Sequence, residues 1–147
     1  MAKFIYRMQS ILDIKEKLKE QARMEFAAAR LKLDEEEEKL KNLCHRKESY
    51  EQQGRDLQKD SLRVPDIIAN RDAISRMKEF IAAQQKEVCR SEEALEKARE
   101  KLQNAMQESK TQERLKEKAF EEFMQEENQR EANEVDELVS YTYGQRR

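Results

Sequence analysis

The chain has 147 residues, of which 42% are charged and 37% hydrophobic, with two glycines and one proline. Globular domains carry about 25% charged residues and many more turn formers, so this composition argues against a compact globular fold. Thirty basic against 32 acidic residues give a net charge of −2 with the signs interleaved. This balance gives the chain no electrostatic reason to bind nucleic acid or an anionic membrane surface.

Hydropathy argues against membrane insertion and secretion. No apolar run exceeds four residues, whereas a membrane-spanning helix needs about 20. Residues 1–8 contain one lysine and one arginine but are not followed by the apolar region of a secretory signal. We therefore expect a cytoplasmic protein.

A first helix is predicted over residues 4–58. Its apolar residues follow one another at spacings of three, four or seven, which is typical of an amphipathic helix. These residues are Phe4, Met8, Ile11, Ile14, Leu18, Ala22, Phe26, Ala29, Leu33, Leu40, Leu43 and Tyr50. Three successive steps of four from Ile14 to Phe26 form a stutter, which predicts a locally straight helix pair.

The acidic run Asp34–Glu38 lies within this helix. Consecutive helical residues point about 100° apart, so five neighbouring carboxylates do not converge on one metal ion. We interpret the run as a solvated outer face of the helix.

A turn is predicted at residues 59–65, where the apolar periodicity fades. Aspartate, serine and the only proline, Pro65, cluster there, and the residue before a proline is biased away from helix. Pro65 suits the first turn of a new helix. A second helix is therefore predicted over residues 66–143, with Gly144 as its stop signal.

The second helix carries an unbroken heptad repeat. One row is bulky and comprises Ile67, Ile74, Ile81, Val88, Leu95 and Leu102. The second row is small or polar and comprises Asn70, Met77, Gln84, Ser91, Ala98 and Ala105. A repeat of seven is the seam of a coiled coil, and a helix of this length needs a partner.

The first helix, folded back, is the simplest partner for this seam. The sequence therefore predicts an all-α fold in which residues 1–147 form a single coiled-coil domain, a long antiparallel two-helix hairpin. A turn centred near residue 62 places residues side by side when their numbers add up to about 125, because both helices rise equally per residue. In this register Phe4 lies near Phe120 and Phe123.

No catalytic, cofactor-binding or metal-binding site is predicted. A two-helix coil has no enclosed interior for convergent catalytic groups, and the chain contains no nucleotide-binding or zinc-protease motif. His45 adjoins Cys44 on a helix, where neighbours point apart. Cys44 and Cys89 are expected about 12 Å apart along the axis, as semi-buried free thiols that are too distant for a disulfide.

Two regions are predicted to be partner surfaces. The first is a partly apolar stripe at the start of the second helix, comprising Ile68, Ala69, Ala73, Met77, Phe80 and Gln84. Phe80 lies outside the seam, which favours a partner contact. The second is the opposite end of the hairpin, with the aromatic and apolar residues Phe4, Ile5, Tyr6, Ile14, Phe120, Phe123 and Met124, near the basic residues Lys3, Arg7, Arg146 and Arg147.

Residues beyond about 124 have no facing part of the first helix in this register. Val135, Leu138, Val139 and Tyr143 form one apolar face there, and an apolar stripe without an internal partner suggests an external one. The alternative is a frayed tail in which these residues have no role.

The opening Phe4-Ile5-Tyr6-Arg7-Met8-Gln9-Ser10-Ile11-Leu12-Asp13-Ile14-Lys15-Glu16, followed by Gln21-Ala22, resembles the start of the FliJ family of flagellar export proteins. The ending Glu134-Val135-Asp136-Glu137-Leu138, with Tyr141 and Tyr143, is similar to the end of that family. The length, the central turn and the long second helix also agree.

This resemblance implies a non-enzymatic component of the flagellar type III export apparatus, similar to the central shaft of rotary ATPases. It implies binding in the ring of the export ATPase FliI, promotion of ring assembly and activity, and contacts with the export-gate protein FlhA and with substrate chaperones. The location implied is the cytoplasmic face of the membrane at the flagellar base.

Site residues are expected for two of these partners, the first from the resemblance and the second from the aromatic-rich end and the terminal apolar face described above. The gate contact corresponds to Ala73, Met77, Phe80 and Gln84. The ATPase-ring contact is expected at Phe4, Tyr6, Arg7, Phe120, Phe123, Val135, Leu138, Val139 and Tyr143.

Two other functions remain open at this stage. A homodimeric scaffold would use the Ile67–Leu102 seam to pair with a second copy, which doubles the mass in solution. A general holdase chaperone for export substrates would bind unfolded or chaperone-bound clients without any effect on nucleotide hydrolysis.

Overall fold

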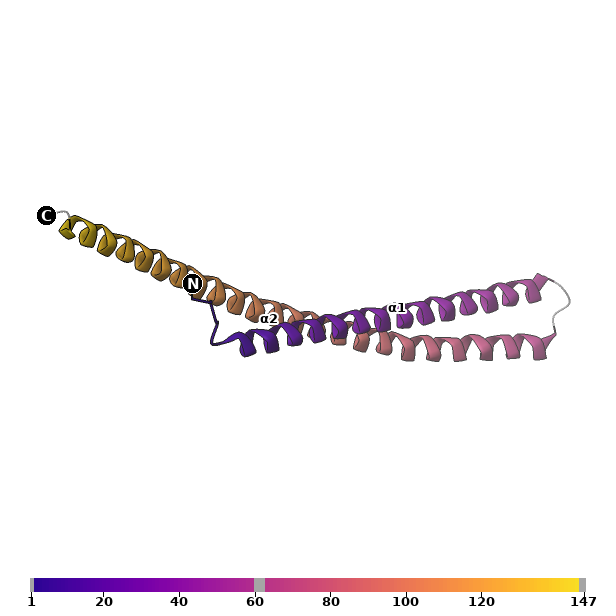
Figure 1. Ribbon diagram of the computed structural model, residues 1–147. Coiled ribbons are helices and arrows are strands. Elements are labelled where there is room, and N and C mark those ends of the chain that lie inside the picture. The colour runs from indigo at the N-terminus through magenta and orange to yellow at the C-terminus, as the bar shows by residue number, and fades with distance from the viewer. Residues whose placement is uncertain (1, 60–62, 146–147) are drawn as a thin grey trace. The chain divides into compact units, whose positions relative to one another are not determined.

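The computed structural model describes residues 2–59 and 63–145. Two helices account for nearly all of them: α1 spans Gln9–Lys59 and α2 spans Val64–Gln145. The described residues contain no strand. The two helices pack against each other in antiparallel directions (Figure 1), which confirms the predicted all-α helical hairpin.

The hairpin divides into two compact units. Unit 1 combines Met1–Gln21 with Gln103–Arg147, and unit 2 is Ala22–Leu102, which contains the connection between the helices. Each unit therefore contains a segment of both helices. The organisation of residues 1–147 as a single domain stays a prediction.

The start of α1 differs from the predicted start near Phe4. Residues 2–6 are not helical, and the first helical hydrogen bonds run from the amides of Ile11 and Leu12 to the carbonyl oxygen of Met8. Phe4 instead packs its ring against Phe120 and Phe123 of α2. Burying this ring outweighs the small gain from one more exposed helical turn.

The beginning of α2 agrees with the role predicted for Pro65. Arg63 offers its carbonyl oxygen to the amides of Asp66 and Ile67, so Pro65 lies in the first turn, where its missing amide hydrogen costs nothing. Part of the predicted turn, with Asp60 and Ser61, lies outside the described residues. Gly144 does not end α2 as expected, because it is helical and has no positive φ.

The heptad seam of α2 is confirmed in unit 2. Both predicted rows are buried or half-buried there, and Met77, Val88 and Ser91 are almost fully covered. Contacts between the helices join residues whose numbers add up to between 120 and 126: Glu25 with Lys101, Glu36 with Gln84, and Tyr50 or Gly54 with Asn70. The predicted antiparallel register is therefore correct.

The stutter predicted in α1 is wrong. Ile14 and Leu18 are 55% and 44% exposed, and the covered positions are instead Leu12, Lys15, Lys19 and Ala22. These positions keep the regular spacing of three and four, because the aliphatic parts of lysine side chains line a seam while their ammonium groups stay in water.

Gly54 allows a close approach between the helices in unit 2. The side chain of Asn70 on α2 donates a hydrogen bond from Nδ2 to the carbonyl oxygen of Tyr50 at 2.8 Å. A Cβ atom at Gly54 would meet the Asn70 amide group. Glycine at this helical position therefore makes room for a polar contact that ties α2 to the backbone of α1.

Candidate functional site

A buried carboxylate lies inside the seam of unit 2. Glu36 is 3% exposed, although it belongs to the acidic run predicted as a solvated face. Gln84 donates from Nε2 to the Glu36 carboxylate at 2.6 Å and to its backbone oxygen at 2.9 Å. Lys32 and Lys39 lie 2.8 and 3.3 Å from the same carboxylate. The prediction fails at Glu36 because this residue occupies a seam position, three residues after Leu33.

The hydrogen bonds to Glu36 change its protonation. Those from Lys32 and Gln84 lower the pKa of Glu36 from 4.5 to about 2. The same contact raises the pKa of Lys32. The folded chain therefore holds Glu36 ionised at pH values at which the unfolded chain already binds the proton.

This difference predicts acid sensitivity. The stabilisation from Glu36 is fully present above pH 4.5 and is lost as the pH falls from 4.5 towards 2, because the group is protonated more readily in the unfolded chain. Thermal unfolding followed by circular dichroism should show a steeper loss of stability over this range in the wild type than in Glu36→Gln. Parallel pH profiles for the two chains would contradict the prediction.

Unit 1 contains a second polar contact inside its seam. Ser109 is 1% exposed and donates from Oγ to Glu16 at 2.6 Å, while Lys19 lies 2.9 Å from the same carboxylate. The hydrogen bond from Ser109 contributes most to lowering the pKa of Glu16 to about 2. A hydrogen bond between the carboxyl groups of Glu113 and Glu16 raises the pKa of Glu113. This contact holds α1 and α2 in register.

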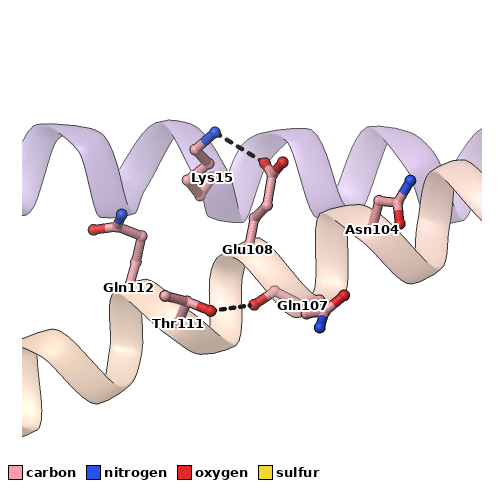
Figure 2. Close-up of a pocket in the computed structure, with 6 residues that line it drawn as sticks. All are labelled: Lys15, Asn104, Gln107, Glu108, Thr111 and Gln112. Carbon is pink, nitrogen blue, oxygen red and sulfur yellow. Dashed lines mark hydrogen bonds and ion pairs between the residues drawn. The ribbon is translucent and has the colours of Figure 1, made fainter.

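A surface groove of about 440 Å³ runs beside this contact in unit 1. Lys15 of α1 and Glu108 of α2 both line it and form an ion pair (Figure 2), with 2.9 Å between Nζ and Oε2. The other lining residues are Asn104, Gln107, Thr111 and Gln112. The Lys15–Glu108 pair is partly exposed, so it is worth about 1 kcal/mol or less.

The residues suggested for a gate contact divide into covered and accessible ones. Met77 is 5% exposed and Gln84 is bonded to Glu36, so both face α1. Phe80 is 54% exposed. Ala73 is half-buried and lines a groove of about 380 Å³ with Tyr50, Gln53, Leu57, Asp66, Ala69 and Asn70. Phe80 and Ala73 are therefore the members of this set that a partner reaches without opening the hairpin.

The aromatic residues suggested for a ring contact partly pack on one another in unit 1. The Phe4 ring lies 5.2 Å from Phe120, edge to face, and 5.4 Å from Phe123. Tyr6 is half-buried, and its covered hydroxyl group has no hydrogen-bond partner among the described residues. Phe120 stays 46% exposed and Arg7 is exposed. This confirms the predicted proximity of Phe4 to Phe120 and Phe123.

The remaining suggested ring residues lie on the last part of α2. Residues 128–145 are exposed throughout, and Figure 1 shows this part of α2 without α1 beside it. Val135, Leu138, Val139 and Tyr143 are 51–72% exposed, and with Thr142 they line a shallow hollow of about 300 Å³. The helix holds these side chains on one face, which argues against a frayed tail. Arg146 and Arg147 lie outside the described residues.

Residues 4–147 match the family described as "Flagellar FliJ protein". This match covers nearly the whole chain. The chain belongs to the FliJ family. No curated protein and no solved structure matches this FliJ chain.

Membership of the FliJ family makes this chain a component of the flagellar export apparatus, and FliJ proteins are non-catalytic. His45 lies 3.9 Å from Glu48 with both side chains exposed, and the described residues of this FliJ chain form no cluster of metal ligands. Cys44 and Cys89 are free as expected, but exposed rather than semi-buried. Within residues 2–59 and 63–145, neither helix has a stretch that is long and apolar enough to cross a bilayer.

The polar contacts in the seam of this FliJ chain are features that sequence reasoning missed. They involve Glu36, Asn70 and Ser109. The sequence does contain a signal for them, because each of these residues falls at a seam position of the heptad pattern. Which residue satisfies each polar group depends on the other helix, and the sequence pattern of one helix does not give it.

Proposed function

We propose that this FliJ chain binds in the ring of the export ATPase FliI and promotes ring assembly and ATP hydrolysis. In this proposal it also couples the ring to the export gate FlhA and to substrate chaperones, at the cytoplasmic face of the membrane at the flagellar base. Family membership supports a role in export.

The observation that carries the ring contact is the exposed end of α2. A single helix with Val135, Leu138 and Val139 on one face leaves apolar area in water, and burying it against a partner is favourable by about 25 cal/mol per Å². Phe120 and Arg7 add exposed aromatic and basic groups within the same unit. These residues form the proposed ring contact.

The gate contact is assigned to the flank of α2 in unit 2. Phe80 offers a large exposed ring, and Ala73 borders a groove that has room for an apolar side chain of a partner. Exposed aromatic residues are typical anchors of protein interfaces. Met77 and Gln84 face α1 and are therefore not proposed as direct contacts.

Nucleotide hydrolysis by purified FliI, titrated with this chain, tests the proposal. We expect a saturable rise in hydrolysis together with a rise in light scattering as rings assemble. The matched control is the chain with Glu79→Gln and Glu93→Gln, which lie on the exposed side of α2. No change in either signal for the wild type would contradict the ring function.

The scaffold alternative needs a seam that is available to a second copy. In unit 2, α1 already covers this seam at Met77, Val88 and Ser91, which argues against pairing through Ile67–Leu102. A solution mass twice the 17.6 kDa of one chain would favour the scaffold. A holdase would instead suppress aggregation of unfolded clients and leave FliI hydrolysis unchanged.

A further inference from the structure

Part of the apolar seam of unit 2 pairs large residues with small ones. In the observed register, facing positions have numbers that add up to about 124. Leu33 then lies level with Ser91, Ala29 level with Leu95, and all four positions are covered or half-covered. Complementary sizes across a seam favour this register.

A displacement of α1 by one heptad conserves this complementarity. Facing numbers then add up to about 131, which places Leu33 level with Ala98 and Ala29 level with Leu102. Leu43 meets Val88 in place of Ile81. A sequence with a strict repeat of seven returns equivalent seam positions after each heptad, so apolar packing distinguishes the two registers poorly.

The polar contacts do distinguish the registers. The observed register joins Glu36 to Gln84 and Asn70 to the carbonyl oxygen of Tyr50. After the displacement Glu36 lies level with Leu95 and keeps only Lys32 and Lys39 of its own helix. A buried polar group that loses its partner is unfavourable, so each contact selects the observed register.

Pro65 selects the direction of the displacement. When facing residue numbers add up to about 131 instead of 124, the centre of the turn lies later in the chain, towards Pro65. A proline is readily accommodated in a turn. A displacement in the opposite direction would start α2 earlier and place Pro65 inside the helix, where it removes a hydrogen bond and clashes with the preceding turn. One alternative register is therefore accessible.

We propose that the two helices have a second register, displaced by one heptad, and that the Glu36–Gln84, Asn70–Tyr50 and Glu16–Ser109 contacts hold the chain out of it. The displacement moves α1 by about 10 Å along α2. In the displaced register Glu51 of α1 lies level with Phe80, whereas Cys44 does so in the observed register. A partner that breaks these polar contacts would thereby change the surface beside Phe80.

Thiol crosslinking in the full chain, with Cys44→Ser and Cys89→Ser, tests this proposal. Leu43→Cys with Ile81→Cys reports the observed register, and Leu43→Cys with Val88→Cys reports the displaced one. With the polar contacts intact, a short crosslinker should join only the first pair. With Glu36→Leu, Gln84→Leu, Asn70→Ala and Ser109→Ala, which remove the three polar contacts, the yield for the second pair should rise at least tenfold.

The matched control carries Glu79→Leu, Glu93→Leu and Asp72→Ala, which are exposed positions of α2, and should crosslink like the wild type. Failure of the Val88 pair in the variant without polar contacts, while the Ile81 pair still links, would overturn the proposal. Loss of helicity and of both crosslinks would overturn it equally, because the contacts would then hold the hairpin together rather than select its register.

Discussion

A chain that ends after Glu134 is expected to keep its hairpin and to lose its stimulation of FliI hydrolysis. The deletion removes Val135, Leu138, Val139 and Tyr143, the exposed face of α2 proposed to contact the ring. Residues 135–145 contribute less than a tenth of the residues in the two helices, and all of them are exposed. Circular dichroism should therefore change by less than a tenth, with an unchanged midpoint of thermal unfolding.

The measurement is the hydrolysis titration with the shortened chain and with two full-length variants. Leu138→Ser with Val139→Ser removes apolar area from the contact face and should reduce the stimulation at least tenfold. The control, Asn133→Ser with Glu137→Ser, changes the opposite side of the same helix and should stimulate like the wild type. Full stimulation by the shortened chain would show that the ring contact lies elsewhere in the chain.

Phe80→Ala and Met77→Ala are expected to weaken gate binding for different reasons. Phe80 is 54% exposed, so its loss should change the free energy of unfolding by about 0.5 kcal/mol or less. Binding to the cytoplasmic part of FlhA should nevertheless fall at least tenfold, because aromatic anchors contribute about 2 kcal/mol or more. Met77 is 5% exposed in the seam, and truncating it should destabilise the hairpin by about 2 to 3 kcal/mol.

Thermal unfolding and FlhA binding, measured on the same samples, separate the two effects. Met77→Ala should recover most of its gate binding at low temperature, where the hairpin is folded, whereas Phe80→Ala should not. Phe120→Ala is the matched control, since it removes a similarly exposed ring from unit 1 and should leave gate binding intact. Gate binding that depends on Met77 but not on Phe80 would refute the assignment.

Much of the fold was predictable because helical periodicity is a property of one chain. The seam rows of α2, the position of Pro65 and the register near a sum of 125 all follow from repeat spacing and equal rise per residue. The approach of Phe4 to Phe120 and Phe123 follows from the same register. The buried face of α1 was harder to predict near Ile14 and Leu18, because more than one set of positions there has the spacing of a seam. Both residues belong to the exposed side of α1.

The candidate site was only partly predictable. Periodicity identified Phe80 as lying outside the seam, and it is exposed. It also placed Met77 and Gln84 in the seam, but the suggested gate set combined them with Phe80, because the resemblance identifies a stretch of the helix and not one of its faces. The exposed stripe at the end of α2 was predictable, because the register leaves that segment without a facing part of α1.

The sequence by itself determined the all-α hairpin and its heptad seam, because apolar residues that recur every seven positions predict a coiled coil, and its opening and ending carried the family resemblance. Only the tertiary structure decided that Glu36 is buried, that Gln84 and Lys32 hold it ionised, and that Gly54 makes room for Asn70. These features depend on which atoms of α1 meet which atoms of α2. Burial and hydrogen bonding are properties of that pairing.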